Sequence, residues 1–178
     1  MTGSSNTIFI FGLGYVGLHL AEQLSRQGWQ IIGTTRTPEN LSDYEQRGWT
    51  ILPFSDDEDV PDLAHHLAGA SALVSTITAI SGRDPVLARH KQAIEGFAGW
   101  TGYVSATSIY PDQAEGWVDE TTIPEPATAR GIARWKAEQE WDEVTGAEIF
   151  RVAGIYGPNR SPFAALRDGR SRIIDKPG

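Results

Sequence analysis

Short apolar runs alternate along the chain with stretches in which apolar residues recur every three or four positions. The first run covers residues 8–11, and the stretch from Val16 to Leu24 follows it with helical spacing. Gly28 stands where a helix of that length would end, and a second apolar run covers residues 29–33. The N-terminal part of the chain is therefore predicted to form a strand, a helix and a second strand.

The same alternation continues through the rest of the chain. Further strands are predicted at residues 49–52, at 72–77, from 103 onward and at 148–152, and helices within 37–48 and at 62–67, 85–97, 129–144 and 161–169. The run at 72–77 is apolar on both faces, as a buried parallel strand should be. Residues 112–128, rich in acidic residues, proline and glycine, are predicted to form a long loop. Six strands alternating with helices predict an α/β fold, a doubly wound parallel sheet or Rossmann fold.

A Gly-x-Gly-x-x-Gly sequence formed by Gly12, Gly14 and Gly17 follows the first predicted strand. The first glycine permits a tight turn, the second lets a pyrophosphate approach the backbone, and the third lets the helix pack close to the sheet. Tyr15 and Val16 stand at the helix N-terminus, whose free N–H groups and positive dipole end attract phosphates. In this strand–turn–helix context the spacing indicates a dinucleotide-binding site, although a glycine-rich turn that binds nothing stays open.

The second predicted strand ends in the sequence Thr34-Thr35-Arg36. NAD-binding folds usually carry an Asp or Glu there, which bonds the ribose 2′-hydroxyl. A guanidinium instead suits a 2′-phosphate, which it can bind through charged, forked hydrogen bonds. We therefore expect Thr35 and Arg36 to favour NADP(H), with NAD(H) as the alternative if Arg36 is a solvated loop arginine or stacks on adenine.

Composition narrows the classes of function. The chain has 178 residues, which suits a single domain spanning 1–178. Its formal net charge is −8, which argues against binding to nucleic acid or to an anionic membrane. There is no cysteine, so disulfides, thiolate catalysis and cysteine-based zinc sites are excluded. The four histidines lack metal-ligand spacing with carboxylates, and no metal site is expected.

The chain carries no sign of a targeting or membrane segment. Residues 1–6 are polar and lack the pattern of a signal peptide. No apolar stretch approaches the roughly 18 residues that a membrane span requires. We therefore expect a cytoplasmic protein whose partner is a small-molecule substrate. The oligomeric state stays open, and a homodimer is one option.

Four motifs together resemble the extended and atypical short-chain dehydrogenases/reductases, also described as NAD-dependent epimerase/dehydratase-like or nucleoside-diphosphate-sugar epimerase-like proteins. They are the glycine motif, Ser-Ala-Thr-Ser-Ile-Tyr at 105–110, Val-Asp-Glu at 118–120, and Arg-Val-Ala-Gly-Ile-Tyr-Gly-Pro at 151–158. The resemblance covers essentially the whole chain. It implies that Ile155 lies at the nicotinamide end of a cofactor and that Thr76 and Ile77 lie over its ribose and pyrophosphate, with Ser105 also among the cofactor-binding residues.

The catalytic residues are where this sequence departs from that family. The family uses a Ser or Thr after the fifth strand and a Tyr-x-x-x-Lys on the next helix, and the matching positions here are Ala106, Arg130 and Arg134. Arginine does not act as a general acid or base near neutral pH, because its pKa stays above about 12. The resemblance implies a cationic contact from Arg134 to the cofactor ribose or phosphate. The alternative is a solvated helix arginine.

Thr107 and Tyr110 are the hydroxyl residues left near the expected nicotinamide, and they are the candidate catalytic residues. With an ordinary pKa near 10, Tyr110 needs a cationic neighbour to act as an acid or base, and Arg130 or Arg134 could be that neighbour. In the alternative, Tyr110 packs under the long loop and its hydroxyl bonds the backbone.

The family places a small substrate lobe largely beyond the sixth strand. Here the chain stops at residues 173–178, in what reads as the start of another element, so we expect either a fragment or a minimal form. The leading expectation is an NADP(H)-dependent oxidoreductase or epimerase acting on a nucleotide-sugar-like or small carbonyl or alcohol substrate. A sensor or regulatory module that binds NAD(P) without turnover is the alternative.

Overall fold

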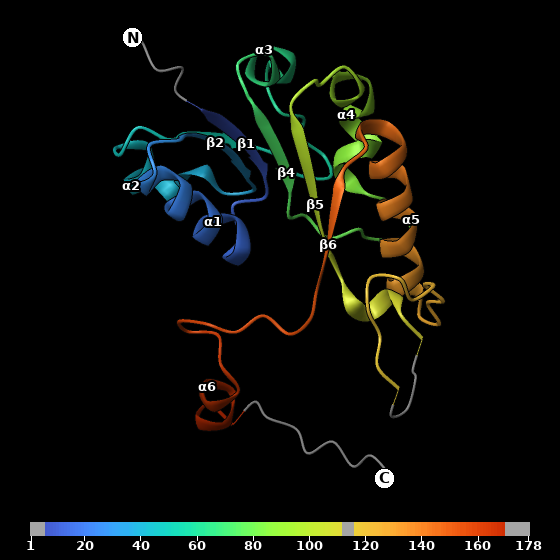
Figure 1. Cartoon of the computed structure of the whole chain (residues 1–178). Coiled ribbons are helices and arrows are strands. Elements are labelled where there is room, and N and C mark those ends of the chain that lie inside the picture. Colours follow the sequence, from blue (N-terminus) through green and yellow to red (C-terminus); the bar gives the residue numbers. More distant parts are fainter. Residues whose placement is uncertain (1–5, 112–115, 170–178) are drawn as a thin grey trace.

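The computed structural model describes residues 6–111 and 116–169, and its centre is a sheet of six parallel strands (Figure 1). The strand order is β3-β2-β1-β4-β5-β6, and each neighbouring pair is parallel. The strands are β1 (Thr7–Phe11), β2 (Gln30–Thr35), β3 (Thr50–Pro53), β4 (Ala72–Ser75), β5 (Trp100–Ala106) and β6 (Glu148–Val152). This sheet confirms the predicted doubly wound Rossmann fold.

Helices separate the strands along the chain. They are α1 (Tyr15–Arg26), α2 (Ser42–Glu45), α3 (Leu63–Ala68), α4 (Pro85–Glu95), α5 (Ala129–Thr145) and α6 (Pro162–Arg167), with short 3₁₀ turns at Pro38–Leu41 and Thr107–Ile109. No helix within the described ranges is both long and apolar enough to cross a bilayer.

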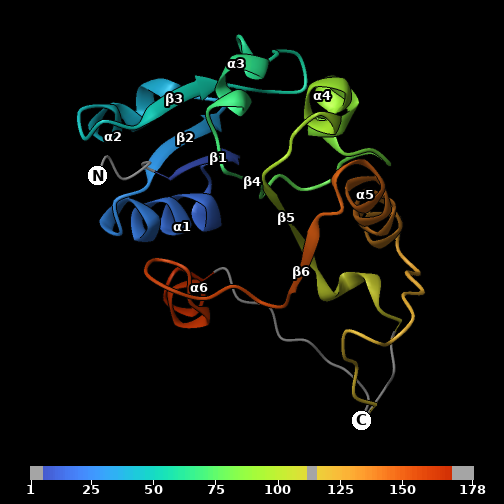
Figure 2. The same ribbon diagram turned by 45° about the horizontal axis from the view of Figure 1, so that its top comes forward.

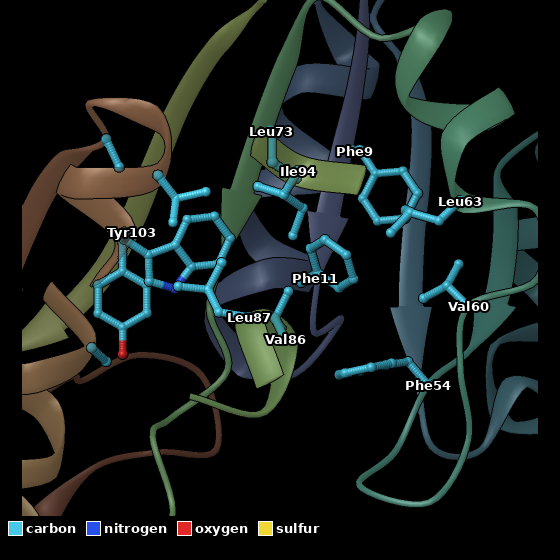
Figure 3. Close-up of a cluster of buried hydrophobic side chains, with 14 of the residues drawn as sticks. Phe9, Phe11, Phe54, Val60, Leu63, Leu73, Val86, Leu87, Ile94 and Tyr103 are labelled. Carbon is cyan, nitrogen blue, oxygen red and sulfur yellow. The ribbon is translucent and has the colours of Figure 1, made fainter. Parts of the chain in front are cut away.

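The helices divide between the two faces of the sheet, with α1 and α2 on one face and α3, α4 and α5 on the other (Figures 1 and 2). Side chains along a strand alternate between faces, so β1 supplies both cores. Phe9 and Phe11 pack with α3, α4 and α5, as Figure 3 shows for the α4 side chains Val86 and Ile94. Residues 8 and 10 pack with α1 in a second cluster.

Several strand limits differ from the predicted ones by one to three residues. The fifth strand begins at Trp100 rather than at Tyr103, because Trp100 and Thr101 pair with β4. The fourth strand ends at Ser75 rather than at residue 77, because the chain turns there and the hydroxyl of Thr76 donates to Gly12 O at 2.7 Å. The predicted element at 173–178 and the first part of the predicted long loop, 112–115, lie outside the described residues.

The strand order reverses between β1 and β4. The chain runs from β1 outward to β3, then crosses the sheet to β4 and runs outward to β6. In an open parallel sheet, the loops at the carboxyl ends of the two central strands then leave in opposite directions and open a crevice between them. The functional residues of such folds are expected at that crevice.

Candidate functional site

The loop between β1 and α1 makes a tight turn at the edge of the crevice. Gly12 has φ +92°, and its N–H donates to Thr34 Oγ1 at 3.0 Å. A Cβ on Gly17 would lie 2.1 Å from Gly12 O, so only a hydrogen fits between the helix and the turn. These two glycines are therefore required by backbone conformation and by close packing, as the sequence argument expects.

Gly14 differs from both, because no atom lies within 4 Å of the position where its Cβ would be. It is the N-cap residue of α1 and offers no side chain to the helix end. The first intrahelical bond is donated by Leu18 to Gly14 O, so the N–H groups of residues 15–17 precede the helical hydrogen bonding. An open glycine beside free amides at the positive end of a helix dipole is a suitable site for a phosphate.

Two hollows flank this helix end. The first, which we call the β2 hollow, has a volume of about 360 Å³ and is lined by the turn after β1, the end of β2 and the segments after β3 and β4. Its lining residues are Gly12, Leu13, Gly14, Thr34, Thr35, Arg36, Phe54, Ser55, Asp56, Thr76, Ile77, Thr78, Ile80 and Pro85. Arg36 is exposed, and no ion pair involves it within the described residues.

The second, which we call the β6 hollow, has a volume of about 320 Å³ and lies on the other side of Gly14. Its lining residues are Gly14, Tyr15, Val16, Thr76, Thr78, Val104, Ser105, Ala106, Arg130, Arg134, Val152, Ala153, Gly154, Ile155 and Arg160. Gly14, Thr76 and Thr78 line both hollows. The two hollows therefore adjoin at the N-terminus of α1, and together we call them the groove.

Arg134 is buried rather than solvated, with a relative exposure of 5%. Its Nη2 donates to Thr78 Oγ1 at 3.2 Å, and Nη1 lies 3.5 Å from Val104 O. Burial lowers the pKa of this guanidinium. Tyr103 opposes that shift in part, Arg130 lowers the pKa by a smaller amount, and Glu138 raises it slightly. Of the two alternatives left by the sequence, the structure excludes a solvated helix arginine.

Thr107 and Tyr110 do not line the groove. They lie in a third hollow of about 500 Å³, which we call the loop hollow, together with Val118, Asp119, Glu120, Ile149 and Arg151. The hydroxyl of Tyr110 donates to Asp119 O at 2.8 Å and accepts from Arg151 Nη1 at 2.9 Å. The cationic neighbour of Tyr110 is thus Arg151. The hydrogen bond to Asp119 O agrees with the alternative in which Tyr110 packs under the long loop and its hydroxyl bonds the backbone. A catalytic role for these two residues stays a prediction.

The structure brings most of the predicted cofactor-binding residues into the groove. Gly12, Gly14, Thr35, Arg36, Thr76 and Ile77 line the β2 hollow, and Gly14, Tyr15, Val16, Thr76, Ser105, Arg134 and Ile155 line the β6 hollow. Gly17 lies buried beneath the turn. The sequence analysis gave no site role to Phe54 or Arg160. Phe54 directly follows the end of β3, and that position was the available signal.

A second set missed from the sequence is the pair Glu138 and Arg151. Glu138 is 2% exposed, and its Oε2 accepts from Nε and Nη2 of Arg151 at 3.1 and 3.0 Å. Burial alone would lower the pKa of Arg151, but its hydrogen bonds to Glu138 and Tyr110 outweigh that effect and raise the pKa. The available signal was an arginine inside a strand and a glutamate on the buried face of the following core helix.

The sequence is similar to a known family of NAD-binding domains and to a curated bacterial protein. The family model of the NAD binding domain of 6-phosphogluconate dehydrogenase matches residues 7–124. Protein YeeZ of Escherichia coli (strain K12) is 30% identical over 173 aligned residues, which cover 87% of this chain and 61% of YeeZ. The chain thus spans about three fifths of the length of this curated relative.

Solved structures share the fold. A functionally unknown conserved protein from Silicibacter pomeroyi DSS matches with TM-score 0.83 and 40% identity, over 97% of this chain and 61% of that one. A protein from Methylobacillus flagellatus, described provisionally as an NAD-dependent epimerase/dehydratase, matches with TM-score 0.72 and 25% identity, over 93% and 59%. UDP-glucuronic acid 4-epimerase from Bacillus cereus, solved with NAD, matches with TM-score 0.70 over 92% and 64%, and at 16% identity it shows the fold alone.

Proposed function

This chain belongs to the family of the NAD binding domain of 6-phosphogluconate dehydrogenase, and from that premise we propose that its groove binds NADP(H). The protein would use this cofactor as an oxidoreductase or epimerase of the atypical short-chain type, acting on a nucleotide-sugar-like or other small carbonyl or alcohol substrate. One observation carries the proposal: the β2 and β6 hollows share Gly14, Thr76 and Thr78 in their linings, at the N-terminus of α1.

The residues present fit a dinucleotide in one orientation. The open backbone at Gly14 and the free amides after it suit the pyrophosphate. Arg36 and Thr35, at the mouth of the β2 hollow, would then contact the 2′-phosphate of the adenosine half. The nicotinamide half would extend into the β6 hollow toward Ile155 and Ser105. When bound, the nicotinamide supplies a hydride acceptor or donor.

A second candidate function is an NADP(H)-binding sensor or regulatory module without turnover. Helix α5 contributes two residues to the β6 hollow, the exposed Arg130 and the buried Arg134. Neither guanidinium releases a proton near neutral pH. Hydride transfer to a carbonyl needs a proton donor at the oxygen. This observation favours a module that responds to the cofactor, or a catalyst whose proton donor is another group.

A titration of the purified chain with NADPH and with NADH tests the proposal. We expect saturable binding of NADPH at a concentration about tenfold lower than for NADH, because only NADPH carries the second charged contact. Equal affinities would contradict the NADP preference, and binding of neither would contradict the proposed function.

Turnover separates the two candidate functions once binding is established. NADPH oxidation is followed at its absorbance band with a panel of small aldehydes, ketones and nucleotide sugars. Oxidation with any of them supports an oxidoreductase. Tight NADPH binding without oxidation across the panel supports the sensor or regulatory module.

A further inference from the structure

The β6 hollow collects positive charge in a protein that is acidic as a whole. Arg130, Arg134 and Arg160 are among its lining residues, and the lining contains no Asp or Glu. The chain as a whole has a formal net charge of −8. By contrast, Asp56 lines the β2 hollow together with Arg36. The positive character is therefore a local property of the β6 end of the groove.

Arg134 carries a buried charge whose hydrogen-bond acceptors are neutral. Its guanidinium reaches the hydroxyl of Thr78 and the carbonyl of Val104, at 3.2 and 3.5 Å. Its Nε has no hydrogen-bond partner within the described residues. The nearest carboxylate on the same helix, Glu138, forms its ion pair with Arg151 instead. A buried cation without a paired anion is costly to fold, so an anion in the hollow would compensate it.

Arg130 adds two further unfavourable electrostatic interactions. It lies in the first turn of α5, which has no acidic residue, at the end of the helix where the dipole disfavours cations. It also stands four residues before Arg134, and like charges at that spacing repel. Both effects disappear when an anion lies between the two guanidinium groups.

A buried hydroxyl completes the polar lining. Ser105, at the end of β5, is fully buried, and its Oγ has no hydrogen-bond partner within the described residues. Buried hydroxyls without partners are uncommon in native proteins and call for an explanation. A ligand oxygen within the β6 hollow would provide one, because Ser105 is among the lining residues.

We propose that the β6 hollow binds an anionic substrate, a carboxylate or a phosphate ester, whose charged group pairs with Arg134 and Arg130. The inference rests on the proposed function, since the substrate would lie beside the nicotinamide half of NADP(H). The shared chemistry is an anionic group, and a phosphate of the cofactor itself is the other source of such a group. The substrate is the better match, because the free amides of α1 already serve the pyrophosphate, whereas both arginines come from α5.

Calorimetric titrations of the full chain with oxalate and with inorganic phosphate, at low chloride, test the inference. Each titration is made with the free chain and with the chain saturated with NADP⁺, and NADPH is titrated separately. We expect at least one of the two dianions to bind saturably to the cofactor-loaded chain. Neutral oxamide, which has nearly the shape of oxalate, should not bind.

Variants then test which arginine pairs with the bound dianion. We expect Arg134→Gln to weaken binding of that dianion by about tenfold or more, and Arg130→Gln to weaken it by a smaller factor. Arg134→Lys, which keeps the charge but loses the fork, should fall between the wild type and Arg134→Gln. Lys136→Gln is the matched control, because Lys136 pairs with Glu140 on the same helix and does not line the hollow.

Three outcomes would overturn the inference or separate it from the proposed function. If neither dianion binds saturably to the wild type, the inference is wrong, and the NADPH titration still tests the proposed function separately. If Arg134→Gln loses NADPH affinity but binds the dianion as the wild type does, Arg134 pairs with a phosphate of the cofactor, and the proposed substrate contact is wrong. If the wild type binds no NADPH, the proposed function fails, and dianion binding by the free chain that depends on Arg134 still supports the anion site.

Thermal unfolding gives a readout that a merely structural arginine would not produce. Without ligand, Arg134→Gln should keep or raise the melting temperature, because it removes an uncompensated buried charge. Added oxalate or phosphate should then raise the melting temperature of the wild type more than that of the variant. A large drop in the melting temperature of the ligand-free variant would contradict the proposal.

Discussion

Arg151 on β6 donates two hydrogen bonds to the same carboxylate oxygen of Glu138 on α5, from Nε at 3.1 Å and from Nη2 at 3.0 Å. Its Nη1 donates to the hydroxyl of Tyr110, which in turn donates to Asp119 O. The guanidinium also lies over the rings of Tyr110 and Trp135, at 5.3 and 5.7 Å from their centroids. One side chain thus joins β6, α5 and the segment that follows β5.

We expect Arg151→Ala to lower the free energy of unfolding by about 3 kcal/mol, because it leaves the buried carboxylate of Glu138 without its ion pair. Urea unfolding followed by tryptophan fluorescence measures this change. The double variant with Glu138→Gln should lose less than the sum of the single variants, because they remove the same interaction. Strict additivity would contradict the coupling of the two side chains.

Tyr110→Phe tests the catalytic hypothesis and the structural contact in one variant. It removes the donor to Asp119 O and an acceptor for Arg151, so we expect a loss of about 1 kcal/mol in the free energy of unfolding. If Tyr110 also supplies the proton, the variant loses hydride transfer while it still binds NADPH. Unchanged turnover with reduced stability would leave Tyr110 with the structural contact alone.

Arg36→Ala should weaken NADPH binding by about 1.5–3 kcal/mol, the usual cost of losing a charged hydrogen-bond partner. NADH binding should hardly change, because NADH has no 2′-phosphate. Arg26→Ala is the matched control, since Arg26 is an exposed arginine of α1 that pairs with Glu22 away from both hollows. An equal loss for both cofactors would contradict the 2′-phosphate contact.

The glycines of the turn should separate folding from binding. Gly17→Ala places a methyl group 2.1 Å from Gly12 O, so α1 must move away from the turn and the melting temperature should fall. Gly14→Ala meets no atom within 4 Å and should melt like the wild type, yet its methyl group would occupy the place of the pyrophosphate. Unchanged NADPH binding by Gly14→Ala would contradict the dinucleotide position.

His90 makes stability depend on pH. Burial lowers its pKa below the ordinary value of 6.5, with a smaller lowering by Arg89 and an opposing effect of Asp59. The backbone N–H of Val60 lies 3.2 Å from Nε2 and donates to the neutral ring. The folded state binds a proton at His90 less readily than the unfolded state does. The contribution of neutral His90 to the free energy of unfolding is therefore complete above the unfolded pKa and is lost as the pH falls below it.

Urea midpoints at about pH 7.5 and about pH 5.5 measure this effect, since the interval contains the unfolded pKa of histidine. We expect the wild type to lose stability on acidification and His90→Gln to lose less. An equal decline in both proteins would assign the pH dependence to groups other than His90. Asp84 is not such a group, because burial raises its pKa and a carboxyl group with a raised pKa gains stability on acidification.

The strands and the glycine turn could be predicted because their causes are local. The apolar run at 8–11 needs only its neighbours to be read as a buried strand, and Gly12 and Gly17 stand at fixed positions in the turn. The Glu138–Arg151 pair could not be predicted, because it depends on how α5 lies across the sheet. The burial of Arg134 depends on the same packing, since a helix arginine is usually solvated.

The position of Tyr110 shows the same limit. Its place near the end of β5 was readable from the sequence, and the resemblance placed it near the nicotinamide. The 3₁₀ turn at Thr107–Ile109 carries it into the loop hollow instead, where Arg151 of β6 meets it. A short turn of this kind changes the direction of the side chains that follow, and no periodic pattern in the sequence predicts it.

The three arginines of the β6 hollow lie in a molecule with a formal net charge of −8, so attraction and repulsion act over different distances. Before it enters the hollow, an approaching dianion meets the field of the whole acidic protein, which reaches about one Debye length from the surface, roughly 8 Å at physiological ionic strength; inside the hollow it meets the arginines. Added salt should therefore speed the encounter by weakening the long-range repulsion, and shorten the residence time by weakening the close contact. Ligand exchange in this hollow would be fastest at high ionic strength, whereas occupancy would be longest-lived in dilute buffer.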